Sequence, residues 1–191
     1  MVIVKLGGSL LGSAELPRWL DAISQTSDGR IVIVPGGGVF ADAVRQAQQT
    51  AGFDDAAAHQ LAVLAMDQYA RVLLALNSTL VAASTELEIA ERSWQHRAIV
   101  WLPSVMVLAE EKIPKTWDVT SDSLAAWLAK RIKAKHLVLV KATEDSSEPN
   151  GLLDVAFDDF AANLQCPVTV LGKNEIERFS AIVKPDMERV E

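Results

Sequence analysis

Two apolar runs near the N-terminus each end in a glycine turn, and this repeat constrains the fold of the chain more than any other feature. Residues 2–6 (VIVKL) lead into Gly7-Gly8-Ser9, and residues 31–34 (IVIV) lead, after one proline, into Gly36-Gly37-Gly38. Runs of β-branched residues without polar alternation are typical of strands that are buried on both faces of a parallel sheet. The repeat therefore predicts two such strands, each with a glycine turn at its carboxyl end.

Each glycine turn is followed by a helix-like segment, over residues 14–24 and 39–51. Glycine lets backbone N–H groups approach an anion closely, and the start of a helix carries a positive partial charge. The two turns therefore predict two phosphate sites, one for a phosphoryl donor and one for its acceptor. The plain alternative for Gly36-Gly37-Gly38 is a flexible strand–helix connection. Neither turn matches the GxxxxGK[ST] or GxGxxG pattern, which argues against P-loop and Rossmann sites.

Lys5 lies inside the first apolar run. A lysine in a buried strand costs free energy unless its charge has a partner, and a phosphate bound at the adjacent Gly7-Gly8 turn is such a partner. The alternative is a lysine at the strand end whose stem reaches solvent. Because the glycine turn is adjacent, the phosphate interpretation is favoured.

A polar stretch, Thr120-Ser121-Asp122-Ser123, opens an alanine-rich helix-like segment. Ser, Thr and Asp are favoured helix N-caps, so capping alone explains the stretch. The carboxylate of Asp122 could instead accept hydrogen bonds from Lys5 and from the glycine-turn amides. A second polar stretch, residues 141–145, follows a strand-like run and either contacts a nucleotide or forms a solvated loop. It carries Lys141, Thr143 and Asp145.

Strand-like and helix-like segments alternate along the whole chain, which predicts an α/β protein, a three-layer αβα sandwich with a mostly parallel central sheet. Further strands are expected at residues 98–102, 136–141 and 167–171, and further helices at 54–76, 86–92, 104–111, 120–134, 157–164 and 174–182. No low-complexity linker divides the chain, so one domain is expected over residues 1–191. A soft boundary would separate an acceptor-binding lobe (1–113) from a shortened nucleotide-binding lobe (114–191).

The composition narrows the function classes. The 191 residues are 50% hydrophobic, which allows a sizeable core, and the formal charge of −7 without a basic stripe argues against nucleic-acid binding. No apolar run reaches the ~18 residues of a membrane helix, and Lys5 interrupts the first run, so neither membrane association nor a signal peptide is expected. These features predict a cytoplasmic protein.

Cysteine and histidine usage predicts no metal-ligating residues. Cys166 is the only cysteine, which excludes an intramolecular disulfide and a CxxC site, and its apolar surroundings predict a buried structural thiol. The three histidines lack metal-like spacing. Of these, His59 on the long helix is expected to be satisfied or exposed rather than catalytic.

Taken together, these residues resemble the amino acid kinase family, which includes carbamate, acetylglutamate, uridylate and isopentenyl phosphate kinases. The motifs run in order along nearly the whole chain: Val2–Ser9, Pro35–Gly38, Thr120–Asp122 and Leu137–Thr143. A second set is similar to the subgroup that converts an aminomethylfuran-methyl phosphate to its diphosphate in methanofuran biosynthesis. That set comprises residues 36–41, 59–62, 66–67, 102–104 and 117–124.

The resemblance implies a kinase that uses ATP and Mg²⁺ and acts on a small phosphorylated substrate. A homo-oligomer is also expected, and the alanine-rich segment 56–76 is either its dimer face or an internal core helix. Lys5 and Asp122 would be catalytic, the first stabilising the transferring group and the second organising the lysine and the loops. The implied contacts to ATP are Gly7, Gly8, Ser9, Lys141, Thr143 and Asp145. The implied contacts to the acceptor are Gly36, Gly37, Gly38 and Thr120.

The chain departs from the family pattern after Asp145. There the family commonly has an Asp-Gly turn and a longer segment with a second lysine near the leaving phosphate, whereas this chain has Ser146-Ser147 and a short remainder. Lys173 is the candidate for that second lysine. Two alternatives therefore stay open: a kinase for another acceptor, such as isopentenyl phosphate or UMP, and a non-catalytic nucleotide- or anion-binding protein that acts through partners.

Overall fold

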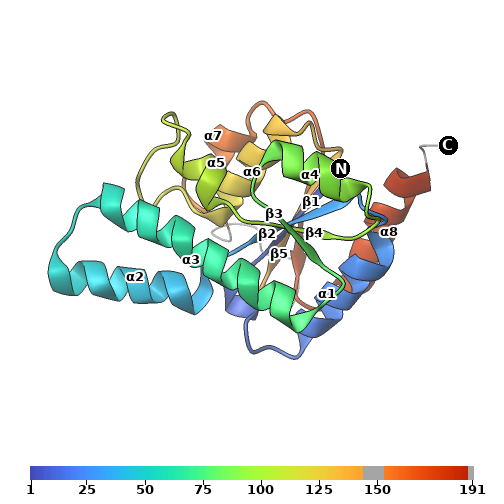
Figure 1. Ribbon diagram of the computed structural model, residues 1–191, viewed down its shortest axis with the longest axis horizontal. Helices are drawn as coiled ribbons and strands as arrows, with labels where there is room; N and C mark the ends of the chain where they lie inside the picture. The colour runs from blue at the N-terminus through green and yellow to red at the C-terminus, as the bar shows by residue number, and fades with distance from the viewer. Residues whose placement is uncertain (144–152, 189–191) are drawn as a thin grey trace.

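The computed structural model describes residues 1–143 and 153–188 of the chain (Figure 1). Its strands are β1 (Val2–Leu6), β2 (Ile31–Pro35), β3 (Val81–Ala83), β4 (Ile99–Trp101), β5 (His136–Lys141) and β6 (Val168–Gly172). Its helices are η1 (Gly8–Leu10), α1 (Glu15–Thr26), α2 (Gly38–Ala51), α3 (Asp55–Leu76), α4 (Glu86–Ser93), α5 (Ser104–Leu108), α6 (Ser121–Arg131), α7 (Phe157–Ala161) and α8 (Ile176–Glu188).

The described strands form one six-stranded sheet in the order β3-β4-β2-β1-β5-β6, and every adjacent pair is parallel. β1 lies between β2 and β5, with Lys5 in register with Val34 on one side and Leu139 on the other. All carboxyl ends therefore point to the same edge of the sheet. The ends of β1, β2 and β5, which carry the predicted site residues, are neighbours there.

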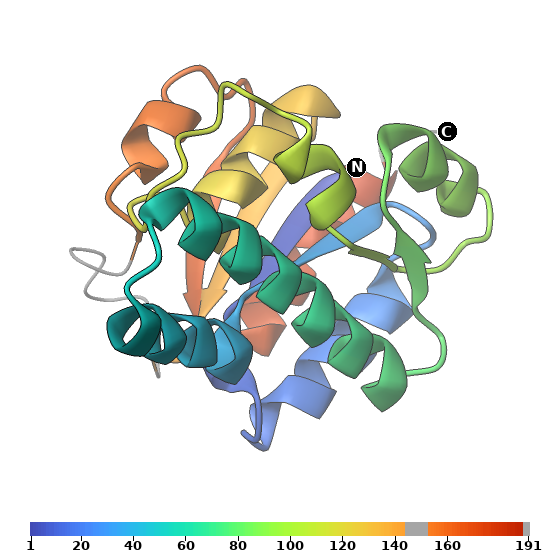
Figure 2. The same ribbon diagram turned by 60° about the vertical axis from the view of Figure 1, so that its left-hand side comes forward.

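Helices cover both faces of the sheet, and each face has its own apolar core (Figures 1 and 2). Successive side chains of a strand point to opposite faces, so Val4 and Leu6 pack with α1, α8 and the second half of α3. Ile3 packs on the other face with α4–α7 and the first half of α3. The predicted three-layer αβα sandwich is confirmed, and the sheet is fully parallel in the part described.

Helices α2 and α3 form a hairpin and lie side by side in both views (Figures 1 and 2). Gly52 ends α2 in the left-handed conformation (φ 72°), and its amide donates to the carbonyl of Gln48. Asp54 caps α3 by accepting a hydrogen bond from the amide of Ala57 at 2.8 Å. This short connection holds the two helices together above the carboxyl edge of β1 and β2.

Element boundaries differ from the sequence-based ones at a few places. Strand β3 was not predicted, because three residues are too few to show a strand period. Helix α6 ends at Arg131, three residues earlier than expected, because Lys133 adopts a left-handed φ of 51°.

Cys166 is half-buried instead of buried, and burial raises the pKa of its thiol. Within the described ranges, no helix is both long enough and apolar enough to cross a membrane.

Candidate active site

The two glycine turns lie against each other at the carboxyl edge of the sheet, because β1 and β2 are neighbouring parallel strands. A Cβ atom on Gly8 would lie 2.1 Å from the amide nitrogen of Gly38, and one on Gly36 would lie 2.3 Å from the amide nitrogen of Gly8. Gly38 also has a left-handed φ of 54°. Glycine is therefore required at these positions because the backbones of the two loops touch there. A merely flexible connection would not impose this requirement. A phosphate-binding role for the same amides stays a prediction.

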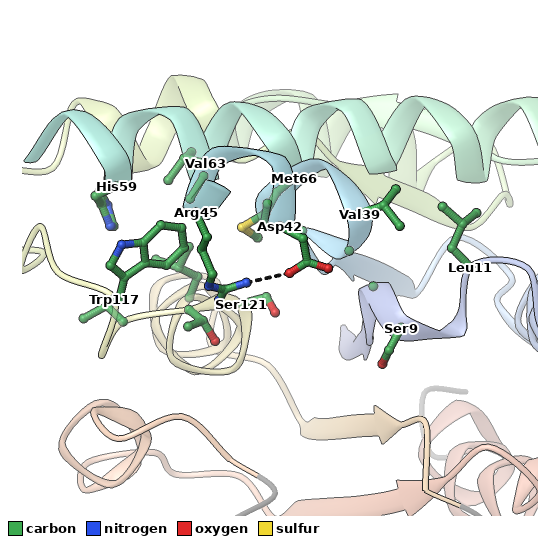
Figure 3. Close-up of a pocket in the computed structure, with 18 of the residues that line it drawn as sticks. Ser9, Leu11, Val39, Asp42, Arg45, His59, Val63, Met66, Trp117 and Ser121 are labelled. Atoms are coloured by element: carbon green, nitrogen blue, oxygen red, sulfur yellow. Dashed lines mark hydrogen bonds and ion pairs between the residues drawn. The ribbon is translucent and has the colours of Figure 1, made fainter. Parts of the chain in front are cut away.

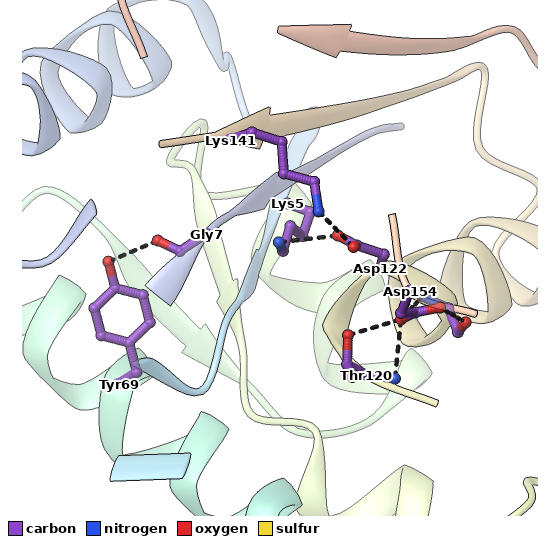
Figure 4. Close-up of polar contacts among 8 residues, drawn as sticks. Lys5, Gly7, Tyr69, Thr120, Asp122, Lys141 and Asp154 are labelled. Atoms are coloured by element: carbon purple, nitrogen blue, oxygen red, sulfur yellow. Dashed lines mark hydrogen bonds and ion pairs between the residues drawn. The ribbon is translucent and has the colours of Figure 1, made fainter. Parts of the chain in front are cut away.

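Lys5, Asp122 and Lys141 form a buried charge cluster next to the first glycine turn (Figure 4). The Nζ atom of Lys5 lies 2.9 Å from Oδ1 of Asp122, and Nζ of Lys141 lies 2.5 Å from Oδ2. The exposed fractions of the three side chains are 6%, 4% and 12%. Neighbouring strands β1 and β5 supply the lysines, and the first turn of α6, which packs on β1, supplies the carboxylate.

Two ammonium groups share one carboxylate in this cluster, so it carries one excess positive charge in surroundings almost closed to water. Burial, followed by the nearby Lys5 charge, lowers the pKa of Lys141 to about 8. Burial alone would raise the pKa of Asp122, but the two ammonium groups hold it below its ordinary value, so this carboxyl stays ionised. A buried excess cation either loses its proton more easily or is stabilised by an anion beside it, and a phosphate oxygen is the anion that the adjacent glycine turn suits.

The structure gives Lys141 a position that the sequence did not predict. The expected place was at the border of the nucleotide, but its ammonium group points to Asp122 and lies on the same carboxylate as that of Lys5. Lys173, the candidate second lysine, instead contributes backbone groups. Its amide donates to the carbonyl of Thr143 at 2.8 Å, and its carbonyl accepts from the indole of Trp19 at 2.7 Å.

A cavity of about 370 Å³ opens beside both glycine turns (Figure 3). This volume is in the range of small-molecule sites. Its wall comes from the two turns, from α2 and α3, and from the segment that leads into α6. The lining residues are Gly8, Ser9, Leu11, Gly37, Gly38, Val39, Ala41, Asp42, Arg45, His59, Ala62, Val63, Met66, Thr116, Trp117, Val119, Thr120, Ser121 and Leu124. Residues on both sides of position 113 therefore line it.

Helix α3 lines this cavity along its length. His59, Val63 and Met66 follow one another along one face of the helix (Figure 3), and the hydroxyl of Tyr69 donates to the carbonyl of Gly7 at 3.4 Å (Figure 4). Tyr69 lies ten positions after His59, which is about 15 Å along an α-helix. The cavity thus runs from the glycine turns to a far end at His59.

His59 is 5% exposed, so of the two expected positions it is not the exposed one: it is a buried residue of the cavity wall. Burial is the main effect that lowers the pKa of its imidazole, the backbone of Thr116 opposes this, and Lys115 adds to it. The ring is therefore neutral at pH 7. A neutral imidazole has one nitrogen that donates and one that accepts a hydrogen bond.

A polar group of side chains lies along one side of the cavity, with Trp117 near His59, and with Arg45 and Asp42 between Trp117 and the glycine turns (Figure 3). The guanidinium of Arg45 lies 4.4 Å from the ring centroid of Trp117 and 2.9 Å from Oδ1 of Asp42. The indole of Trp117 donates to Oε1 of Gln48 at 2.7 Å. The Arg45 and Asp42 side chains are 48% and 70% exposed, so they form the mouth of the cavity.

Thr120 lies in the cavity wall, but its hydroxyl is already in use (Figure 4). It donates to Oδ2 of Asp154 at 2.7 Å, and the amide of Thr120 donates to the same atom at 2.9 Å. A hydroxyl has one proton to donate. Towards a ligand, the Thr120 oxygen can therefore only accept a hydrogen bond.

The other predicted site residues take different positions. Gly7 is buried, whereas Ser9 is exposed in the 3-10 turn η1 and lines the cavity. Thr143 is exposed after β5. Asp145 lies outside the described residues, as do Ser146 and Ser147. In residues 1–143 and 153–188, no three His, Cys, Asp or Glu side chains are grouped so that they could hold a metal ion.

Three features of the site were not predicted from the sequence: the ammonium position of Lys141, the Arg45–Trp117 pair and the contacts of Asp154. Lys141 ends a strand, as Lys5 nearly does, and that shared placement was a usable signal. Arg45 and Asp154 gave none, since the contacts in question join them to Trp117 and Thr120, which are far away in the sequence.

Comparison with known proteins shows what this chain is similar to. Residues 1–90 match the model of the Amino acid kinase family. The resemblance to that family is confirmed. The chain is also 29% identical, over 140 residues and 73% of its length, to the (5-(aminomethyl)furan-3-yl)methyl phosphate kinase of Methanocaldococcus jannaschii. This match spans 64% of the length of that relative.

Solved structures of a uridylate kinase, a UMP kinase and an isopentenyl phosphate kinase have the same fold. Uridylate kinase from Archaeoglobus fulgidus has a TM-score of 0.72 at 17% identity, covering 96% of this chain and 95% of that one. UMP kinase from Ureaplasma parvum gives 0.65 at 13%, covering 90% and 88%. An isopentenyl phosphate kinase gives 0.58 at 15%, covering 97% and 96%. At these identities the likeness establishes the fold.

Proposed function

We propose that this chain is an ATP-dependent kinase that adds a phosphoryl group to a small phosphomonoester and so makes a diphosphate. The observation that carries this proposal is the buried cluster of Lys5, Asp122 and Lys141, with its one excess positive charge, beside two touching glycine turns. Phosphoryl transfer needs mainly positioning and stabilisation of charge on the phosphate oxygens. The cluster and the backbone amides are suited to both.

In this proposal an oxygen of the acceptor phosphate attacks the γ-phosphorus of ATP. The new bond joins that oxygen to the phosphorus, the bond from the γ-phosphorus to the bridging β–γ oxygen breaks, and ADP leaves with that oxygen. Lys5 neutralises charge on the transferring group, Lys141 supports it from β5, and Asp122 holds both ammonium groups in place. Mg²⁺ would arrive on the β- and γ-phosphates. A phosphate nucleophile needs no strong general base.

The proposed phosphate contacts follow the two strands. Gly7, Gly8 and Ser9 would hold the donor phosphates, and Gly36, Gly37 and Gly38 would hold the phosphate of the acceptor. Lys141, Thr143 and Asp145 would border the nucleotide. In the same proposal, residues up to 113 serve mainly the acceptor and later residues mainly the nucleotide, although Thr116–Thr120 also line the cavity.

The acceptor that we propose is (5-(aminomethyl)furan-3-yl)methyl phosphate, the molecule named for the relative from M. jannaschii. The cavity supports a ligand with a phosphate at one end, a flat apolar middle and a hydrogen-bond donor beyond it. The middle is lined by Val63, Met66 and Leu124. Two hydrogen-bond acceptors are also available in the wall: the neutral imidazole of His59, and the hydroxyl oxygen of Thr120, whose proton is donated to Asp154. An aminomethyl group is such a donor.

The direct test is to incubate purified protein with Mg-ATP and the aminomethylfuran phosphate, and to follow ADP and the diphosphate product. We expect both products in equal amounts, and much slower turnover with UMP and isopentenyl phosphate. ADP formation with UMP or isopentenyl phosphate alone would retain the kinase and change its substrate. No ADP with any of them, together with no ATP binding by calorimetry, would favour the non-catalytic alternative.

Self-association and a cytoplasmic location belong to the same proposal. Leu61 and Leu64 of α3 are 41% and 43% exposed, and such a helix face suits contact with a second copy. Analytical ultracentrifugation of the wild-type chain and of a Leu61→Glu/Leu64→Glu variant would test this. A dimer that the double substitution converts to a monomer is the expected result.

A further inference from the structure

Asp154, between β5 and α7, has no part in the reaction proposed above, yet it makes four contacts with the start of α6. Its Oδ2 atom accepts from the amide of Thr120 (2.9 Å), from the hydroxyl of Thr120 (2.7 Å) and from the amide of Ser123 (3.0 Å). Its Oδ1 atom accepts from the hydroxyl of Ser123. The carboxylate thus binds the residues on either side of Asp122 in the helix (Figure 4).

These contacts replace an ordinary helix cap. The first amides of a helix have no partner within the helix, and the side chain of the N-cap residue usually accepts from one of them. Thr120 is the N-cap of α6, but its side chain accepts from none of these amides; its hydroxyl donates to Asp154, and the amide of Ser123 donates to Asp154 as well. A carboxylate more than 30 positions further along the chain satisfies these donors instead.

The start of α6 is buried, so its orientation has consequences. Ser121, Asp122 and Ser123 are 8%, 3% and 0% exposed. A second tie holds the Asp154 segment in place, since the amide of Ala156 donates to the carbonyl of Asp118 at 3.1 Å. A small rotation of this turn would move the Asp122 carboxylate away from the two lysines.

We propose that Asp154 is a positioning residue for the charge cluster: by binding Thr120 and Ser123, it fixes the Asp122 carboxylate between Lys5 and Lys141. The effect on turnover rests on the proposed kinase function, but the placement of Asp122 does not. Lys141 faces Asp122 from α6 and Lys5 from β1, so its ammonium group reports on that placement. If the carboxylate moves away, Lys141 loses its stabilising partner and releases its proton at lower pH.

The test is an NMR titration of the full chain, without substrate, that follows the ¹³Cε signals of labelled lysine. In the wild type, Lys141 is expected to titrate near its pKa of about 8. The double variant Thr120→Val/Ser123→Ala keeps every charge and removes both hydroxyl donors, so a Lys141 pKa lower by about half a unit or more would reflect displacement alone. Asp154→Asn should shift it further. Asp158→Ala, at an exposed carboxylate of α7, is the matched control and should leave it unchanged.

Kinetics supply the second readout. Misplacing a reacting geometry by about 1 Å can cost about 100-fold in rate, so Asp154→Asn should lower kcat by about that factor with little change in KM. If Asp154→Asn does not fold, the double variant carries the test. An unchanged Lys141 pKa in the folded variants would overturn the proposal. An inactive wild type would overturn the kinase proposal alone, because the titration needs no turnover.

Discussion

The charge cluster and the side of the cavity that Arg45, Asp42 and Trp117 form are built from different parts of the molecule. Lys5 and Lys141 stand on adjacent central strands, so the hydrogen bonds of the sheet fix the distance between them, and both side chains are at least 88% buried. Arg45, Asp42 and Trp117 stand on α2 and on the segment before α6, where the Arg45 and Asp42 side chains are about half or more exposed. In the proposed kinase, phosphate chemistry would therefore be tied to the sheet, whereas the wall that meets the rest of the acceptor could change without disturbing it.

The largest effect is expected in the charge cluster. Lys5→Ala removes a buried cation from the proposed site of the transferring phosphate, and groups of this kind are worth about 100- to 1,000-fold in kcat. Steady-state kinetics with Mg-ATP would measure the loss, and circular dichroism would check the fold. Lys130→Ala, at an exposed lysine of α6, is the control and should keep full activity. Unchanged turnover in Lys5→Ala would separate the cluster from the chemistry.

The contact between the glycine turns is the next test, because it joins the strand ends to the cavity. Gly8→Ala would place a Cβ 2.1 Å from a backbone nitrogen, which cannot move like a flexible side chain. We expect the free energy of unfolding to fall by about 1–3 kcal/mol, with a loss of activity at temperatures where the protein still folds. Denaturant unfolding beside Ser9→Ala, whose side chain is exposed, measures this. Equal stability of the two variants would show that the loops can separate freely.

The pH dependence of kcat/KM tests the part that Lys141 plays in the charge cluster. Lys141 has a lowered pKa of about 8, so its ammonium is present below that pH and lost above it. kcat/KM, which reports on the free enzyme, should therefore fall about tenfold per pH unit above pH 8. Bound phosphates raise the pKa of a cation, so the limb of kcat should lie at higher pH. Lys141→Arg stays charged and should lose this limb; a limb that persists in Lys141→Arg belongs to another group.

The smallest effect is expected at the cavity wall. His59→Phe keeps a ring of similar size but removes the hydrogen-bond acceptor, so it should raise KM for the amine-bearing acceptor about tenfold and leave kcat nearly unchanged. His59→Gln, which retains an acceptor, should be milder. An acceptor analogue that lacks the amine should not distinguish the wild type from His59→Phe. A fall in kcat instead would place His59 in the chemistry.

Much of the fold could be predicted from the sequence, because it depends on local patterns. The β-branched runs at residues 2–6 and 31–34 mark strands, and the glycines after them mark turns wherever the strands lie in the sheet. The encounter of Lys141 with Lys5 could not be predicted, since it requires β5 to pair with β1, more than 130 residues away. Asp154 was missed for the same reason: nothing near it in the sequence indicates a helix start that needs a carboxylate.

The mutual fit of the two turns bears on how this site can change. Because Gly8 and Gly38 occupy each other's side-chain space, a larger residue at either position can be accommodated only if the opposite loop shifts first. Such paired constraints make single steps costly and leave the turns nearly frozen while α2 and α3 vary. New acceptors would then arise by refitting the helical hairpin around an anchor that stays the same.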